Sequence, residues 1–395
     1  MKMKNNILSL GIFLKSILFI DTVLCTDYTW YSNFRYRLKN DTSEDVIKNT
    51  ISSSSELRTR LGLKITNDNA MGHVVLQDSR TVGESKNNSG ITGETLPVFF
   101  HQAYFSLKLN KQSLTIGRFE LAFGSQRIIA KNNWNNVGRS FEGVLLKGHY
   151  EILDLNYHAF SLPLHEQISN HHDNSKDSWL SGVYLNKYFT TKPGNKLSTE
   201  AYYMFSQDST EKYSYNMFGS RIEMNWNSLL LESEFAFQLN DSINANLFSI
   251  NFGFQPKKYK FFNSIIVGFE QVSGDDTTTL DKEEGFSKYF GARHKHHGFY
   301  DYKEHKKYFG HLHDGLNEIN IKTNFKLMNY SSLLIAFHNF KSNYKKEKYG
   351  SEFDFILKTR HNKQMSSELG VCLYQEEKNK NDILPFLYLS LNVSI

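Results

Sequence analysis

The sequence is poor in the residues that cross-link or interrupt small folds. Among 395 residues it has two cysteines, five prolines and 24 glycines. Beyond the first 25 positions it also lacks any apolar run of roughly 20 residues, the length that a membrane-spanning helix needs. These absences exclude a disulfide scaffold, a collagen-like chain and a helical membrane protein. The formal charge of +5 is small as well, so we predict no nucleic-acid partner, because such proteins carry a larger basic excess.

Aromatic residues, in contrast, are abundant. Phe, Tyr and Trp make up 14% of the chain, although the whole hydrophobic set reaches only 39% and the mean hydropathy is -0.49. A chain this aromatic has much surface to bury and is not expected to be disordered. Two classes remain: a large soluble β-rich protein, and a β-barrel that turns an apolar residue toward lipid at every second position.

The N-terminus has the features of an export signal. Two lysines precede an apolar stretch over 7–20 that only Lys15 interrupts, and 23–25 offers a cleavage site. We predict a cleaved signal peptide over 1–25 and a single outer-membrane β-barrel domain over 26–395. The alternative is an N-terminal membrane anchor, which the short run and its internal lysine disfavour. Cleavage removes three lysines and one aspartate, so the net charge falls from +5 to +3.

From residue 28 onward apolar and polar residues alternate with period two, as in strands whose two faces meet different environments. In 316–327, for example, Ile319 and Ile321 share one face, whereas Lys322 and Lys326 share the other. Such segments run for about 10 to 13 residues, longer than the usual 5 to 6 of soluble sheets and close to the 9 to 11 of transmembrane strands. The pattern predicts an all-β, transmembrane antiparallel β-barrel.

We count about 18 strands, and the lengths of their connections alternate. Even-numbered links are short, whereas odd-numbered links include the long ones, such as 124–140 and 273–314. Short periplasmic turns opposite long external loops are typical of barrels in the bacterial outer membrane. The predicted strands are 28–38, 55–66, 70–79, 99–109, 112–123, 141–148, 152–162, 178–190, 197–206, 213–226, 229–239, 243–254, 259–272, 315–328, 331–341, 350–361, 364–375 and 383–395.

Several motifs, in order along the chain, resemble the alginate export family of outer-membrane proteins. Phe119 departs from the family pattern, which often has Gln at that place. A later segment that begins at His294 is similar to the family's His-Lys-x-x-Gly-x-x-Asp loop. The earlier motifs are Gln102-Ala103-Tyr104, Gly117-Arg118-Phe119-Glu120, Gly124-Ser125-Gln126-Arg127 and Trp134-Asn135-Asn136-Val137-Gly138-Arg139-Ser140-Phe141-Glu142-Gly143.

The resemblance implies an 18-stranded barrel whose lumen, narrowed by inward loops and lined with arginine, passes an anionic polysaccharide such as alginate. The expected partners are this polymer or small anionic solutes, outer-membrane lipid and periplasmic export proteins. A diffuse row of guanidinium groups suits such a polymer, because it compensates charge without trapping it. The candidate pore-lining and anion-binding residues are Arg58, Arg60, Arg118, Glu120, Arg127, Trp134, Arg139, Glu142, His294 and Arg360.

Three other interpretations stay open at this point. In the first, the only role of the lumen arginines and glutamates would be to pair with one another and stiffen the wall. A general nutrient porin without a polysaccharide role would show the same fold and charges. A barrel hydrolase would need a nucleophile and base such as Ser140 and His158, which nothing in the sequence marks as a pair. No phosphate-binding or dinucleotide fingerprint is present, so we predict a protein that is not an enzyme and has no cofactor.

The longest predicted loop is rich in histidine, with six between 294 and 313. Imidazole clusters bind zinc or copper, but this spacing matches no defined motif, and we predict no metal there. We hypothesise instead that His294 and His296 line the entrance and attract anions when they are protonated near pH 6.

Overall fold

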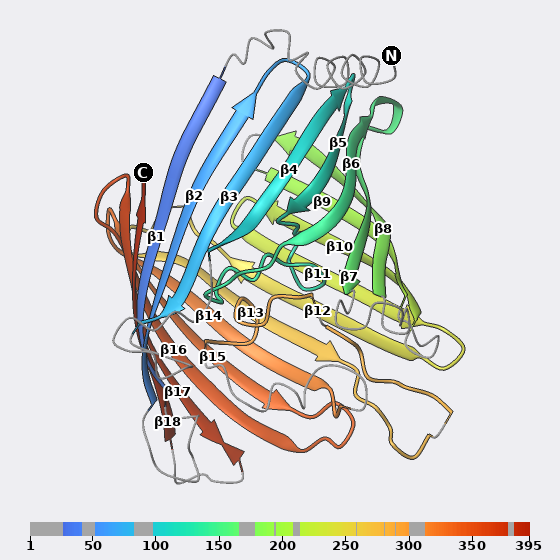
Figure 1. Ribbon diagram of the computed structural model, residues 1–395. Helices are drawn as coiled ribbons and strands as arrows, with labels where there is room; N and C mark the ends of the chain where they lie inside the picture. Colours follow the sequence, from blue (N-terminus) through green and yellow to red (C-terminus); the bar gives the residue numbers. More distant parts are fainter. Residues whose placement is uncertain are drawn as a thin grey trace, which may run out of the picture.

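The protein is a closed barrel of eighteen antiparallel strands, which confirms the predicted fold class (Figure 1). Each strand pairs with its sequence neighbours, and β1 also pairs with β18, so the sheet has no open edge. The computed structural model describes residues 27–41, 52–82, 98–165, 178–192, 195–207, 214–257, 259–279, 281–288, 290–299, 313–377 and 383–395. The predicted signal peptide lies outside them and stays a prediction.

The strands are β1 (Asp27–Asp41), β2 (Ser52–Thr66), β3 (Ala70–Thr81), β4 (Phe99–Leu109), β5 (Gln112–Phe119), β6 (Phe141–Tyr150), β7 (Leu155–His165), β8 (Ser178–Lys192), β9 (Asn195–Gln207), β10 (Tyr215–Trp226), β11 (Leu229–Leu239), β12 (Asn244–Phe254), β13 (Phe262–Val272), β14 (Leu316–Met328), β15 (Ser331–Lys341), β16 (Lys348–Arg360), β17 (Met365–Glu376) and β18 (Ile383–Ser394). A short 3-10 turn, η2 (Glu151–Leu153), precedes β7. Among the described residues no helix is long and apolar enough to cross a membrane.

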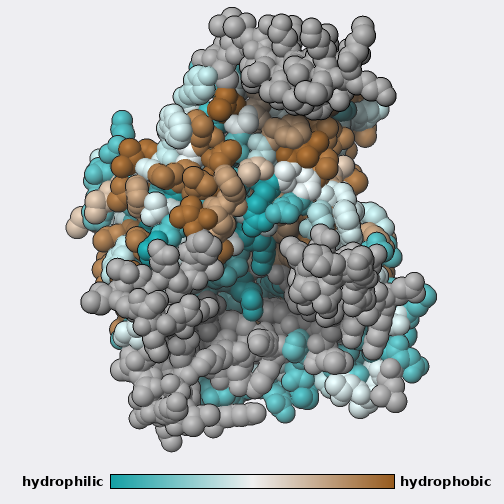
Figure 2. Space-filling model, viewed as in Figure 1, coloured by the Kyte–Doolittle hydropathy of each residue, from teal (hydrophilic) through white to brown (hydrophobic). Residues whose placement is uncertain are grey.

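The predicted alternation sorts residues between the outside and the lumen. On β14, Ile319 and Ile321 are exposed on the outer face, whereas Glu318 and Asn320 between them are buried on the inner face. The same holds on β18, where Leu387 and Leu389 face outward. Figure 2 shows apolar side chains gathered over the outside of the strands and a hydrophilic hollow between them. The outer face therefore suits lipid, and the inner face suits water.

The lengths of the connections confirm the predicted alternation of short and long links. Short turns join β2 to β3, β4 to β5 and β14 to β15, and the long links lie at the other end of the barrel. Because the number of strands is even, β1 begins and β18 ends at the same end as the short turns.

β5 is shorter than predicted, because it ends at Phe119 and not at 123. The chain then leaves the wall and turns into the barrel through two residues with left-handed φ, Gly124 at 45° and Gln126 at 69°. A side chain at Gly124 would place its Cβ 2.4 Å from a carboxylate oxygen of Glu200 on β9. Only glycine fits this approach to the far wall without strain.

Two long connections fill part of the lumen. We call residues 120–140 connection 5–6 and residues 273–315 connection 13–14. The apolar core cluster includes Ile129 of the first connection and Phe286 of the second, and both are completely buried. Ala130, next to Ile129 in the chain, is completely buried as well. Figure 1 shows connection 5–6 and described parts of connection 13–14 inside the barrel. The apolar core is thus the packing of these connections against the inner wall, and they position the site.

Candidate functional site in the barrel lumen

A group of arginines lies on the inner face of β1 and β2. The strand register places Arg35 directly opposite Arg58, and each is only 6% exposed. Like charges in opposite positions repel, so this pair needs compensation from elsewhere. Connection 5–6 supplies it with backbone carbonyls: Arg35 donates to the oxygens of Asn133 at 2.7 Å and Asn135 at 3.1 Å. Arg58 donates to the same two oxygens at 3.3 and 3.4 Å.

The neighbouring arginines have carboxylate partners. Arg37 pairs with Glu56 at 3.0 Å and lies 4.2 Å from the ring centre of Trp134. Arg60 pairs with Glu120 at 3.2 Å, the first residue of connection 5–6. These contacts tie β1 and β2 to the inward connection at both ends of the arginine group.

Glu120 collects positive partners. His101 lies 2.9 Å and Lys131 3.3 Å from its carboxylate. Burial alone would raise the pKa of Glu120, but the His101 hydrogen bond and the charges of Arg60 and Lys131 lower it to about 2. Glu120 is therefore a fixed negative charge that holds connection 5–6 against β2.

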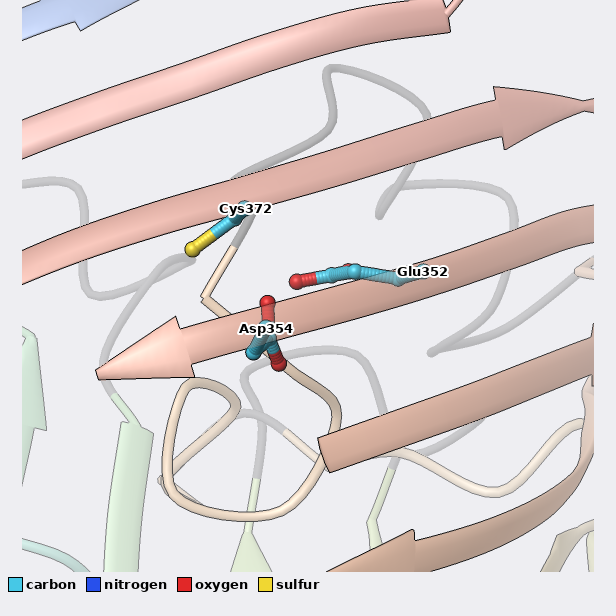
Figure 3. Close-up of side chains that lie close together, drawn as sticks. All are labelled: Glu352, Asp354 and Cys372. Carbon is cyan, nitrogen blue, oxygen red and sulfur yellow. The ribbon is translucent and has the colours of Figure 1, made fainter. Parts of the chain in front are cut away.

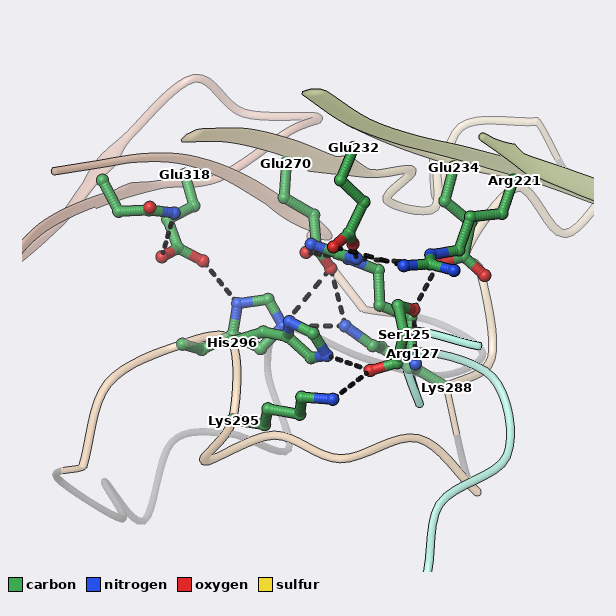
Figure 4. Close-up of polar contacts among 12 residues, drawn as sticks. Ser125, Arg127, Arg221, Glu232, Glu234, Glu270, Lys288, Lys295, His296 and Glu318 are labelled. Carbon is green, nitrogen blue, oxygen red and sulfur yellow. Dashed lines mark hydrogen bonds and ion pairs between the residues drawn. The ribbon is translucent and has the colours of Figure 1, made fainter. Parts of the chain in front are cut away.

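The opposite wall is acidic and is neutralised from the loops (Figure 4). Arg127 extends from connection 5–6 to Glu232 and Glu234 of β11 and to Glu270 of β13, the last at 2.8 Å. Lys288 of connection 13–14 also pairs with Glu270, at 2.6 Å. Burial favours a lower pKa for Arg127, but the three carboxylates outweigh it and raise the pKa, so this arginine stays charged.

The two connections also bind each other. The amide of Ala130 donates to the carbonyl of Phe290, and the amide of Ala292 donates to the carbonyl of Gln126, both at 2.8 Å. Arg139 donates to the Phe290 carbonyl as well. Burial, followed by the charge of Arg293, lowers the pKa of Arg139 to about 10, and the side chain remains positive at neutral pH.

Between these walls lies a cavity of about 450 Å³. Its lining includes Arg35, Trp134, Lys295 and Lys322. Lys295 donates to the carbonyl of Ser125 and Lys322 to that of His296, each at 3.0 Å. A second cavity, of about 310 Å³, lies on the acidic side of the loops next to Arg127.

Seven of the ten predicted site residues come together around these connections. Arg360 is different, since it is exposed at the short-turn end of β16, beside a separate cavity of about 480 Å³. The seven are Arg58, Arg60, Glu120, Arg127, Trp134, Arg139 and His294.

Arg118 and Glu142 lie elsewhere, and this corrects their predicted lumen position. Arg118 shares its strand face with Leu114 and Ile116, whereas the inward positions of β5 are those of the buried Thr115 and Phe119. It pairs at 2.9 Å with Glu142, whose side chain is 62% exposed. The pair is on the outer face near the long-loop end, because both residues occupy the outward positions that alternate with the buried Phe119 and Phe141.

The sequence motifs missed several residues of the lumen. Lys288 comes from connection 13–14 and lies outside every motif, although it pairs with Glu270. Lys295 follows His294 in the quoted motif, but its partner, the carbonyl of Ser125, is 170 residues away. The period-two alternation could have identified Glu270 and Lys322, because both occupy inward positions of strands that it predicts.

The histidines of connection 13–14 have separate environments. His294 packs against Trp134 with ring centres 3.9 Å apart. His297 hydrogen-bonds Glu318 of β14. Burial, followed by the charges of Arg127 and Lys288, holds the pKa of His296 well below its usual range. The pH hypothesis therefore does not hold for His296, which stays neutral near pH 6. His305 and His311 lie outside the described residues.

Ser140 and His158, the pair considered for a hydrolase, do not meet. The Ser140 hydroxyl donates to the carbonyl of His101 at 2.5 Å and lies 3.1 Å from His101 Nδ1. His158 instead stacks beside Phe123 and Tyr184 on the inner wall.

Comparisons with known proteins agree with this architecture. The crystal structure of OccAB4 from Acinetobacter baumannii is similar, with a TM-score of 0.63 and 13% identity over 93% of this chain and 98% of that chain. The outer membrane protein opdK from Pseudomonas aeruginosa has a TM-score of 0.65 and 10% identity, over 94% and 99% of the two chains. At these identities the likeness concerns the fold.

No curated protein sequence matches the chain. The family model for alginate export, however, matches residues 31–370. The match covers most of the chain and every motif that carried the resemblance, and it agrees with the closed barrel. The protein belongs to the alginate export family and is an outer-membrane β-barrel of bacteria.

Proposed function

We propose that the protein is a passive channel that conducts anionic solutes, with an alginate-like polysaccharide as its cargo. The observation that carries the proposal is a set of lumen cations whose partners are neutral. Arg35, Arg58 and Lys322 are bonded to carbonyl or amide oxygens. In the part of the chain that the structure describes, no carboxylate forms an ion pair with any of them, so their positive charge is not cancelled by a carboxylate within the lumen.

The acidic wall supports this assignment by contrast. There Arg127 and Arg221 each contact more than one carboxylate, so their charge is already compensated. The lumen cations with neutral partners lie instead on β1, β2 and β14. A charged polymer would contact those cations as it passes.

The arrangement suits passage better than tight binding. The cations are spread over three strands and held in place by loop carbonyls, so a polyanion exchanges one guanidinium for the next as it moves. The stacked inward connections narrow the lumen beside them. Trp134, which packs between Arg37 and His294, lines the same cavity.

Two alternatives differ from this proposal in what they predict. A nutrient porin without a polysaccharide role would be anion-selective but would not be blocked by a polyuronate. A barrel hydrolase would release product from lipid or polymer. The hydrogen bond from the Ser140 hydroxyl to a backbone carbonyl gives no support to that second alternative.

The decisive experiment is the reversal potential of the reconstituted protein in a KCl gradient. Replacement of Arg35 and Arg58 by Gln should lower the anion-to-cation permeability ratio, by about fivefold for each kcal/mol of lost attraction, where one charge contributes about 1 kcal/mol at 4 Å in water. Arg118→Gln is the matched control, because Arg118 lies on the outer face. An unchanged ratio in the double variant would contradict the proposal.

A further inference from the structure

A second cluster of reactive side chains lies on the lumen face of β16 and β17. Glu352 and Asp354 are two positions apart on β16 and so share a face, and the register pairs Asp354 directly with Cys372 of β17. Their ligand atoms all lie within 4.8 Å of one another. Figure 3 shows the thiol and the two carboxylates converging between the strands. Among the described residues, this is the only such convergence of His, Cys, Asp and Glu.

The cluster is buried, and one of its two carboxylates, that of Asp354, has no hydrogen-bond partner. Asp354 and Cys372 are completely buried and Glu352 is 1% exposed. Neither carboxylate oxygen of Asp354 has a hydrogen-bond partner in the structure. Buried carboxylates are otherwise paired or coordinate a metal, so these two oxygens are suited to bind a cation.

His338 of β15 adds a fourth group. Its Nδ1 lies 2.6 Å from Glu318, and its Nε2 lies 3.5 Å from Asp354 Oδ2. A hydrogen bond from Nδ1 to a carboxylate leaves the Nε2 lone pair free and turned toward the cluster. This is the arrangement of histidines that ligate metals, whose second nitrogen donates to a carboxylate.

We propose that Cys372, Asp354, Glu352 and His338 bind one divalent transition-metal ion of the zinc class. Sulfur, nitrogen and carboxylate oxygen form a tetrahedral set for Zn²⁺, with bonds of about 2.0 to 2.3 Å. On binding, the Cys372 thiol loses its proton to water as the sulfur–metal bond forms. The set is too soft for Mg²⁺ or Ca²⁺, which take oxygen ligands alone.

The metal would tie the inward connection to the wall. The amide of Phe299 donates to Glu352 at 2.7 Å, so connection 13–14 rests on one of the proposed ligands. Gly298 permits this approach, since its φ is 85° and a Cβ there would lie 2.5 Å from the same carboxylate. Metal binding thereby fixes the loop that narrows the lumen, whatever solute the channel passes.

The test uses the full-length barrel, stripped with a chelator and titrated with Zn²⁺ or Co²⁺. We expect one Zn²⁺ per barrel by calorimetry, and with Co²⁺ a sulfur-to-metal charge-transfer band together with strong visible bands of tetrahedral geometry. Cys372→Ser should abolish the charge-transfer band, and Asp354→Asn should weaken binding by about 100-fold or more, since loss of an outer partner of a metal ligand already costs about 10- to 100-fold.

Glu368→Gln is the control, because Glu368 is on the same face of β17 but pairs with Lys358. It should bind Zn²⁺ as the parent does. Heat-modifiable migration on gels shows which variants fold. If a variant fails to fold, protection of the Cys372 thiol from a small thiol reagent by Zn²⁺ in the parent protein provides an independent readout. Absence of saturable binding, or equal binding by folded Cys372→Ser and Asp354→Asn variants, would overturn the proposal.

Discussion

Arg35 and Arg118 have the same side chain but opposite surroundings, because they occupy opposite faces of their strands. Arg35 is buried in the lumen against loop carbonyls, whereas Arg118 pairs with Glu142 on the outer face. Motif similarity suggested Arg118 as a pore residue, but the alternation of inward and outward positions along β5 places it on the outer face. For a barrel, the face of each position is therefore a better guide to function than the motif in which it occurs.

Glu120 carries a prediction about acid stability. Its pKa in the folded protein is about 2, below the ordinary 4.5, so its charge stabilises the fold above pH 4.5 and this contribution disappears as pH falls toward 2. The shift corresponds to about 3 kcal/mol. Urea unfolding of Glu120→Gln should lose that pH dependence. Glu142→Gln, at an exposed position, should keep it, and identical acid profiles for the two variants would refute the assignment.

Arg127 carries a prediction about loop anchoring. Arg127→Met removes the positive charge that pairs with Glu232, Glu234 and Glu270. Removing one partner from a buried ion pair costs about 3 to 5 kcal/mol, and the free energy of unfolding should fall by this amount. Arg118→Met removes an exposed pair and should cost less than about 1 kcal/mol. Equal losses would mean that Arg127 is not the anchor.

Among the elements, the strands follow from local alternation and the inward connections do not. Seventeen of the eighteen strands end within a few residues of the predicted bounds. The end of β5 differed because the apolar alternation continues through Leu121 and Phe123, which pack inside the barrel and not in the wall. The contact between Arg127 and Glu270 spans 143 residues, and no local pattern predicts such a pairing.

The contact between the two connections is itself testable. A Cβ at Gly291 would lie 2.0 Å from the carbonyl oxygen of Arg127, so Gly291→Val should separate connection 5–6 from connection 13–14. We expect a larger and noisier single-channel conductance, since the two connections narrow the lumen together. Gly72→Val is the control, because nothing lies within 4 Å of a Cβ there. Unaltered conductance in Gly291→Val would show that the contact does not set the pore width.

For the whole molecule, the division into an apolar outer face and a polar inner face explains the low mean hydropathy of so aromatic a chain. The apolar outer face and the charged inner face average to a mean hydropathy of -0.49, although neither face has that character alone. The same barrel is shared by OccAB4 and opdK at only 10 to 13% identity, so the fold tolerates nearly complete change of its residues, and the solute is set by the lumen side chains.

The orientation in the membrane can be checked by thiol labelling. In a Cys372→Ser background, Thr277→Cys lies in an exposed part of the long connection 13–14, and Asn329→Cys lies in the short turn between β14 and β15. A membrane-impermeant maleimide should label the first in intact cells and the second only after the outer membrane is permeabilised. The reverse labelling pattern would show that the barrel has the opposite orientation in the membrane.

Attraction of anionic saccharide chains by the lumen cations of β1, β2 and β14 is the basis of the proposed function. It is tested most directly by adding alginate oligomers to the reconstituted channel and recording the current. We expect anion selectivity and a concentration-dependent block, which weakens in the Arg35→Gln, Arg58→Gln double variant and is absent with neutral oligosaccharides of equal length. Cation selectivity, or equal effects of charged and neutral oligomers, would contradict it.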